Sequence, residues 1–397
     1  MDPELINMPR LSITINKIEF ISVLFINCGV SGCSILFKSN NDKMTSIIGK
    51  IYKKNNYLSN KTTFDINKYD EITEKGLSPR FISRYNINND YNFKTTLYNV
   101  IDENIYNNFI DLYEVGGFMT VLSYINFSND FNKLNNYKDI IKIIDIIIKK
   151  LTVLNDDLFI IQRDSHLNNV LISNNYTVYL FNLYCYYKDL IKSNTNPEQL
   201  KKYEKQLINI LFKNKQLSKE FLDSNLNKDF IHLNKDIDCN LIDFDLMLDL
   251  KEIFNYTKKY LKMNDQKIND ILYFILYVFK EADKLFVLDD FYYSMNEINN
   301  KNIEQIKNHI ISTKKKIIDG ILKNCKFTQK YNFNQIMYLI DIIHGFIYST
   351  NEKHIINQNS FDNLFNFIYN KEFLKDNVKY FNNDKWIIID NIFKNKI

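Results

Sequence analysis

Two short stretches of the sequence carry side chains that suit phosphoryl transfer. Asp164 and Asn169 stand five positions apart and lead into an apolar segment, and Asp243 follows a second apolar segment downstream. A carboxylate can orient an attacking hydroxyl group, and an Asn and a second Asp can hold Mg²⁺ against the phosphates. Each stretch alone is also typical of a polar turn or a solvated loop. The two in this order favour a nucleotide-dependent phosphotransferase.

The front of the chain is expected to form a small sheet with one helix. β-branched and aromatic runs bounded by Gly and Asn clusters are typical of strands, and a Gly with a Pro just beyond it is typical of a helix end. The expected strands cover 17–26, 34–38, 46–52, 80–86 and 109–114, and the helix covers 64–75.

After Gly116 and Gly117 the pattern becomes mainly helical, with apolar residues at helical spacing. Helices are expected over 137–154, 269–282, 303–322 and 334–348, and short strands around 170–172, 177–181 and 240–244. A lysine-rich stretch over about 187–235 separates the two chemical stretches. It must loop out of the core if Asp164 and Asp243 are to meet.

Bulk properties exclude several classes of protein. A chain of 397 residues with 45% hydrophobic residues fits a two-lobed fold or two domains. A net charge of +4, with both signs interspersed, gives no reason to expect a nucleic-acid partner. The apolar run over 18–37 approaches the length of a membrane span, but polar residues and glycines interrupt it, so two strands around a turn are expected and no membrane span.

The five cysteines include no Cys-x-x-Cys pair, and their number is odd. This pattern favours a reducing compartment over a disulfide framework or a zinc site.

The ordered motifs resemble those of the protein-kinase-like superfamily, and in style its divergent branch in large DNA viruses. The family's catalytic loop reads His-Arg-Asp with Asn five residues after the Asp, and Gln162, Arg163, Asp164 and Asn169 fill these positions. The resemblance implies that Asp164 is the catalytic base and Asn169 a Mg²⁺ ligand. Asp243, in Asp-Phe-Asp where the family has Asp-Phe-Gly, would be the second Mg²⁺ ligand.

The resemblance extends to residues that would bind ATP. Gly29 and Gly32 stand between two expected strands, as in a glycine loop over phosphates, although an ordinary hairpin turn explains them equally well. Lys50, in Ile-Ile-Gly-Lys, would bind the α- and β-phosphates. Its acidic partner from the following helix would be Asp65, with Glu71 as the alternative.

Three further residues take roles from the resemblance. Glu114 lies in a segment similar to the hinge that holds adenine, although any glycine-containing loop reads the same way. Asp270 falls where the family has a buried helix Asp that braces the catalytic loop, with a surface Asp at a helix start as the equal alternative. His166 stands where Ser/Thr protein kinases usually carry Lys, a pattern similar to aminoglycoside and choline kinases, and we count it among the cofactor-binding residues.

The resemblance implies an α+β, bilobal protein-kinase-like fold. A β-rich lobe over 1–115 would bind ATP. A helical lobe over 116–397 would carry the catalytic loop, the insertion and a helical extension over about 287–397.

The implied activity is ATP- and Mg²⁺-dependent transfer to Ser or Thr hydroxyls of a protein substrate, as in a viral kinase of the host cytoplasm or virion. His166 and the lack of Ala-Pro-Glu favour a small-molecule alcohol as the alternative acceptor. Gln162, Ile48 and Asp65 favour a catalytically weak pseudokinase that acts as a scaffold.

Overall fold

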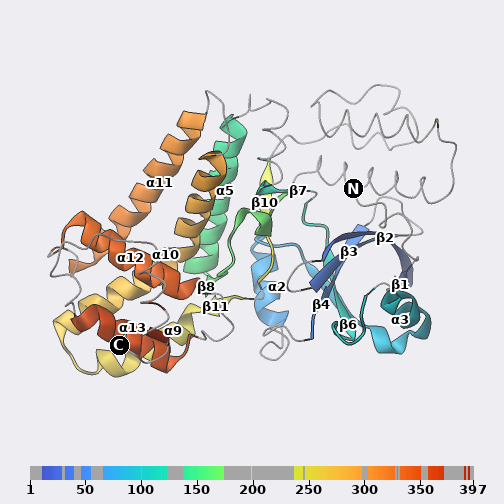
Figure 1. Ribbon diagram of the computed structural model, residues 1–397, viewed down its shortest axis with the longest axis horizontal. Helices are drawn as coiled ribbons and strands as arrows, with labels where there is room; N and C mark the ends of the chain where they lie inside the picture. The colour runs from blue at the N-terminus through green and yellow to red at the C-terminus, as the bar shows by residue number, and fades with distance from the viewer. Residues whose placement is uncertain are drawn as a thin grey trace. The chain divides into compact units, whose positions relative to one another are not determined.

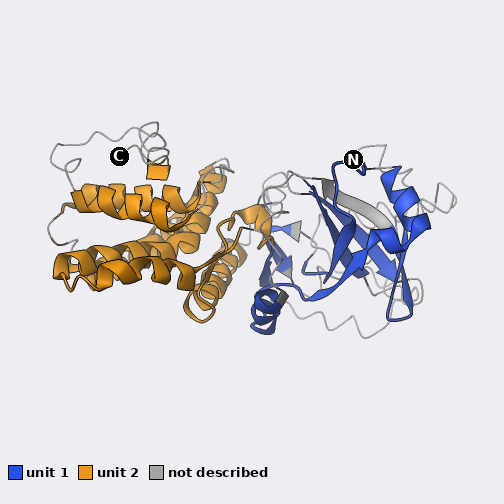
Figure 2. Cartoon of the chain, turned by 90° about the horizontal axis from the view of Figure 1, so that it is seen from below, with its two compact units in different colours: residues 1–132, 170–242 blue, residues 133–169, 243–397 orange. Residues whose placement is uncertain are grey.

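The computed structural model describes an α+β protein with an antiparallel six-stranded sheet and a mainly helical remainder (Figure 1). The described residues are 11–28, 32–39, 46–54, 66–99, 101–117, 119–122, 125, 137–173, 198, 237–244, 246–296, 303–326, 329, 331–349, 356–370, 389 and 392–393. The chain forms two compact units, residues 1–132 with 170–242 and residues 133–169 with 243–397 (Figure 2). This division differs from a single boundary after residue 115, because the chain returns to the first unit over 170–242.

The large sheet of the first unit has the strand order β1-β2-β3-β4-β6-β5, with every neighbouring pair antiparallel. The strands are β1 (Ser12–Ile15), β2 (Ile18–Cys28), β3 (Gly32–Ser39), β4 (Ser46–Tyr52), β5 (Phe81–Asn86) and β6 (Phe109–Glu114). All five strands expected at the front are confirmed, with the expected bounds for β4 and β6. The edge strand β1 was not expected.

The apolar run over 18–37 forms the hairpin of β2 and β3, as the sequence predicted. Among the described residues, none of the helices combines the length and the apolar character that crossing a bilayer requires. The hairpin register places Cys28 opposite Cys33, and Cys33 is disulfide-bonded. The expectation of a chain without disulfides is therefore wrong at Cys33, because spacing along the chain does not show which cysteines the fold brings together.

Alternation along β4 gives the sheet two different faces. Ile47 and Ile51 are buried in one apolar core with Phe93 and Leu97 of α3 (Tyr91–Tyr98). This helix was not expected. Asp90 caps it by accepting a hydrogen bond of 2.9 Å from the Phe93 amide.

The helix α2 (Ile66–Glu74) confirms the helix expected over 64–75, and Gly76 follows it with φ of 67°. This is the left-handed conformation that glycine adopts at helix ends. The remaining strands among the described residues are short: β7 (Met119–Thr120), β8 (Ile160–Ile161), β9 (Val170–Ser173), β10 (Asp238–Leu241) and β11 (Leu248–Asp249). The strand expected over 177–181 and the stretch over 187–235 lie outside the described residues, except residue 198.

A single long helix, α10 (Gln266–Asn296), organises the second unit. Within the described part of the unit it contacts the helices α5 (Tyr137–Asp156), α9 (Leu250–Leu261), α11 (Ile303–Asn324), α12 (Phe333–Ile347) and α13 (Gln358–Asn370). The helices predicted over 137–154, 303–322 and 334–348 are confirmed. The helix predicted over 269–282 is longer at both ends.

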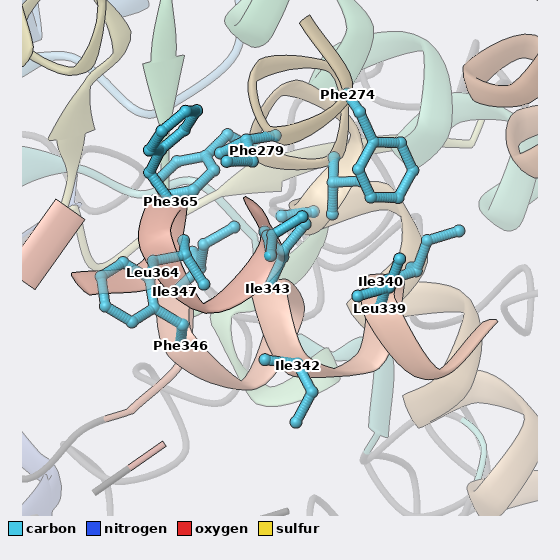
Figure 3. Packing of buried hydrophobic residues seen from close by; sticks show 14 of the residues in the cluster. Phe274, Phe279, Leu339, Ile340, Ile342, Ile343, Phe346, Ile347, Leu364 and Phe365 are labelled. Carbon is cyan, nitrogen blue, oxygen red and sulfur yellow. The ribbon is translucent and has the colours of Figure 1, made fainter. Parts of the chain in front are cut away.

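The C-terminal helices share their core with α10 (Figure 3). Phe274 and Phe279 of α10 pack with Ile343 and Phe346 of α12 and with Leu364 of α13, all fully buried. Burying an apolar side chain of this size contributes about 1.5–3 kcal/mol. The described helices α12 and α13, which lie after residue 287, thus contribute to the second unit's core.

Candidate active site

Two short antiparallel ladders hold the loops that carry the candidate catalytic residues. β8 pairs with β11, and β9 pairs with β10. The loop of residues 162–169 runs from β8 to β9, and the loop of residues 242–247 runs back from β10 to β11. Val170 pairs with Leu241, so Asn169 and Asp243 leave the same end of that ladder. Pairing between strands far apart in the sequence thus brings the two motifs together.

The side chains of Asp164 and Asn169 are hydrogen-bonded to each other. The Asn169 amide nitrogen Nδ2 donates to Asp164 Oδ2 at 2.8 Å and to the Asp164 carbonyl at 2.9 Å. The Asn169 backbone amide donates to the His166 carbonyl at 2.8 Å, within a short 3₁₀ turn over Leu167–Asn169. Both donor hydrogens of the side-chain amide point to Asp164, so Asn169 Oδ1 is the atom left to accept or to ligate.

The backbone ahead of Asp164 is braced by Asp283 of α10. Asp283 is fully buried, and its carboxylate accepts from the Gln162 amide at 2.6 Å and from the Arg163 amide at 3.1 Å. Of the two alternatives for Asp270, the structure has the surface Asp near a helix start and not the brace. Asp270 lies thirteen residues earlier on α10, where it accepts from Gln266 Nε2 at 2.7 Å in an exposed hydrogen bond.

A second carboxylate of α10 braces the far side of the loop. Asp290 accepts a hydrogen bond of 2.7 Å from the Leu167 amide. Asp283 and Asp290 are seven residues apart, which is two helical turns or about 10.5 Å along one face of the helix. One rigid helix therefore fixes the loop on both sides of Asp164.

Arg163 and Asp243 both adopt left-handed backbone conformations, with φ of 64° and 61°. Such a conformation costs a residue other than glycine about 1–3 kcal/mol, and it persists only where surrounding contacts enforce it. Arg163 Nε donates to the Ile347 carbonyl at 2.9 Å, and Phe244, next to Asp243, is 3% exposed. Strain at both motifs is typical of a functional site.

The oxygen atoms at this place fit a Mg²⁺ ion. Asn169 Oδ1 and the Asp243 carboxylate are the hard ligands that Mg²⁺ prefers, and Mg²⁺ usually takes only one or two protein carboxylates beside phosphate oxygens and water. Within the described part of the chain, no three His, Cys, Asp or Glu side chains gather as a closed metal site.

His166 lies beside the candidate base. Its Nε2 atom is 3.4 Å from Asp164 Oδ1, and its side chain is about one-third exposed. It can therefore reach both the carboxylate and a group that approaches from solvent.

Lys50 lies in the first unit, on the face of the sheet opposite the apolar core. Its Nζ atom stands 4.8 Å from the centre of the Tyr52 ring, and β6 places Asp111 directly opposite it. Asp111 is fully buried and accepts two bonds from Arg84, at 2.6 Å and 2.9 Å. The bond to Asp111 raises the pKa of Arg84, so the guanidinium stays charged. This face therefore presents two cations beside one buried carboxylate.

The helix α2 packs on this same face. The Tyr69 ring of α2 meets the Tyr113 ring of β6 edge-on at 5.6 Å, and Tyr113 pairs with Ile48, two residues before Lys50. Asp65, the expected partner of Lys50, lies outside the described residues, and the alternative Glu71 is exposed.

The glycine and hinge residues have roles within the first unit. Gly29 lies outside the described residues, whereas Gly32 packs so closely on β4 that an added Cβ would lie 2.0 Å from the Ile51 carbonyl oxygen. Glu114 pairs with Arg80 at 2.7 Å, and its amide donates to the Arg80 carbonyl at 2.9 Å. The Glu114 amide is thus used in the sheet.

Asp283 carried a signal in the sequence that was missed. It stands in an apolar helical stripe with Phe279 and Ala282, and a carboxylate at such a position is almost never buried unless it is paired. Asp111 carried no such signal, since its place beside Lys50 depends on pairing between distant segments.

A scan against protein-family models finds no match for this chain, and a search of curated proteins finds none with significant similarity.

Proposed function

We propose that this chain is an ATP- and Mg²⁺-dependent phosphotransferase that acts on Ser or Thr hydroxyls of proteins, as a viral kinase of the host cytoplasm or virion. The observation that carries the proposal is the direct bond between Asn169 and Asp164, in a loop that runs beside the one carrying Asp243.

In this proposal the residues of the site divide the work of positioning the acceptor, the metal and ATP. Asp164 accepts the proton of the acceptor hydroxyl, or orients that hydroxyl toward the γ-phosphate. Asn169 Nδ2 holds the Asp164 carboxylate, while Asn169 Oδ1 and Asp243 would hold Mg²⁺. The bound Mg²⁺ would supply charge neutralisation at the phosphates. Lys50 would bind the α- and β-phosphates of ATP.

The test is phosphate transfer from labelled ATP to generic acceptor proteins and to the chain itself. Asp164→Asn keeps the shape of the side chain but removes its basicity, so transfer should fall about 10²- to 10⁴-fold. Asp319→Asn changes an exposed carboxylate of α11 and is the matched control, with wild-type activity expected. Equal activity of Asp164→Asn and the wild type would refute the assignment of the base.

His166 favours a second candidate, a small-molecule alcohol as acceptor. Its imidazole lies 3.4 Å from the candidate base and is solvent-accessible, so it could bind a polar group of a small acceptor. Turnover with a panel of aminoglycosides and amino alcohols, without labelling of any protein, would support this candidate. If ATP with Mg²⁺ is not turned over and does not raise the melting temperature, the scaffold alternative gains support.

A further inference from the structure

We propose that Tyr348, at the end of α12, is a positioning residue for Asp164, so that the C-terminal helices are part of the catalytic apparatus. The inference rests on the proposed phosphotransferase function. It assigns a role to a region that the sequence motifs leave out.

The first contact is between Tyr348 and Asp283, the residue that braces the backbone ahead of Asp164. The Tyr348 hydroxyl donates to Asp283 Oδ1, the same oxygen that accepts from the Arg163 amide. Burial first, and then the Asp283 carboxylate, raise the pKa of Tyr348 well above its usual range. The hydroxyl therefore stays protonated and remains a donor.

Two neighbouring rings fix the orientation of the Tyr348 ring and so direct its hydroxyl toward Asp283. It stacks on the Phe286 ring with centres 4.3 Å apart and planes 4° apart, and the His344 ring lies 4.7 Å away. Phe286 is on α10, three residues after Asp283, so the same helix carries the brace and the stacking partner. The hydrogen bond and the stack together fix the end of α12 on α10.

The second contact is with the residue directly before Asp164. Arg163 Nε donates to the Ile347 carbonyl at 2.9 Å. At the end of α12, the Ile347 carbonyl thus holds the side chain of Arg163. Tyr348 next to it holds Asp283, which in turn accepts from the Arg163 backbone amide. Arg163 needs such support because its φ of 64° is strained.

The end of α12 is itself immobilised by the core. Phe346 and Ile347 are fully buried, and α12 begins with a capping box between Asn332 and Gln335. The direction in which the chain enters Asp164 is therefore set by the packed interior of the second unit. A displacement of about 1 Å can cost a reaction about 100-fold, so this support affects the transfer step.

The test compares Tyr348→Phe with Tyr260→Phe. Tyr260 also donates its hydroxyl to a carboxylate, Asp362, at 2.9 Å, in the same unit but between α9 and α13. Both variants lose one hydroxyl from a Tyr–Asp hydrogen bond. Only the first loses support of the catalytic loop.

We expect Tyr348→Phe to lower kcat at least about tenfold with KM for ATP within about twofold of the wild type, and Tyr260→Phe to change neither. A kcat for Tyr348→Phe equal to that of the control, or a change confined to KM, would overturn the inference. Inactive wild-type protein would instead contradict the proposed function.

Hydrogen exchange gives a readout that does not depend on activity. The amides of Gln162 and Arg163 donate to Asp283, so they should exchange about tenfold faster in Tyr348→Phe and at the wild-type rate in Tyr260→Phe. Unchanged exchange at both amides in Tyr348→Phe would overturn the inference whether or not the protein transfers phosphate.

Discussion

Replacing Asp283 with Asn should destabilise the second unit, and the hydrogen bonds of the brace allow the size of the effect to be worked out. Asp283 Oδ2 accepts from the Gln162 amide, and Oδ1 accepts from the Arg163 amide and the Tyr348 hydroxyl. An Asn can keep the Oδ1 bonds, but its NH₂ group then faces the Gln162 N–H across what was a 2.6 Å hydrogen bond. The Gln162 N–H is left without its acceptor, and the new NH₂ group faces another donor.

The substitution loses hydrogen-bond free energy and regains a smaller part of the cost of burying a charge. A buried donor without a partner costs about 1–3 kcal/mol, and the two remaining bonds lose charge assistance worth about 1 kcal/mol each. Removing a buried charge returns part of this, because a carboxylate is costly to desolvate. We expect a net decrease of about 2–4 kcal/mol in the free energy of unfolding.

Urea unfolding followed by the helical circular dichroism signal is the measurement, because the long helices belong to the second unit. The expected decrease corresponds to a midpoint about 1 M lower. Asp270→Asn, on the same helix, alters an exposed hydrogen bond to Gln266 and should stay within about 0.5 kcal/mol of the wild type. Equal stability of Asp283→Asn and Asp270→Asn, or a lower stability of Asp270→Asn, would refute the role of Asp283 in bracing the loop.

Two further predictions concern packing and a buried thiol. Gly32→Ala should lower the melting temperature, since its Cβ would lie 2.0 Å from the Ile51 carbonyl oxygen and overpacking costs about 1–3 kcal/mol. Gly320→Ala, with nothing within 4 Å of its Cβ, should leave the melting temperature equal or higher, because Ala favours a helix by up to about 1 kcal/mol. Burial first, and then Asp270, raise the pKa of Cys325 to about 12 from an ordinary value of 9.0. At pH 9 the folded thiol should therefore resist alkylation, while the unfolded thiol, about half ionised, should react.

The two glycine variants are compared in one thermal scan, and equal losses at both positions would contradict the packing explanation. For Cys325, mass spectrometry of the alkylated peptide identifies the site. Rapid labelling of folded protein at pH 9 would show that the thiol is not protected as described.

The strands of the front were predictable because they are runs of β-branched and aromatic residues bounded by Gly and Asn clusters. Which face of β4 enters the core was less visible, since Ile47 and Ile51 are buried there while Ile48 lies on the other face. The helix α3 was not predictable in this way. Its sequence includes two Thr and two Tyr, which are weak helix formers, and Asp90 caps it through a contact that spacing does not reveal.

The motifs of the candidate site were predictable from the sequence, but the residues that hold those motifs in place were not. Asp164, Asn169 and Asp243 lie on two adjacent loops of the second unit, as their order suggested. The predicted helix ended at residue 282 and did not include Asp283, so Asp270 was the candidate that the sequence offered, and the packing of α10 places Asp283 at the loop instead. Asp111 enters beside Lys50 because β6 lies next to β4, a pairing that is not local in the sequence.

The ladder of β9 and β10 has a further consequence for how this chain could change over evolution. Ser173 pairs with Asp238 at one end of the ladder, and Val170 pairs with Leu241 at the other, three residues or about 10 Å away. The segment between Ser173 and Asp238 is therefore attached at one end of the ladder, and Asn169 and Asp243 follow from the other end. Its length could vary between descendants, or be shortened to a tight turn by an engineer, while the spacing of the two loops is kept by the same four residue pairs.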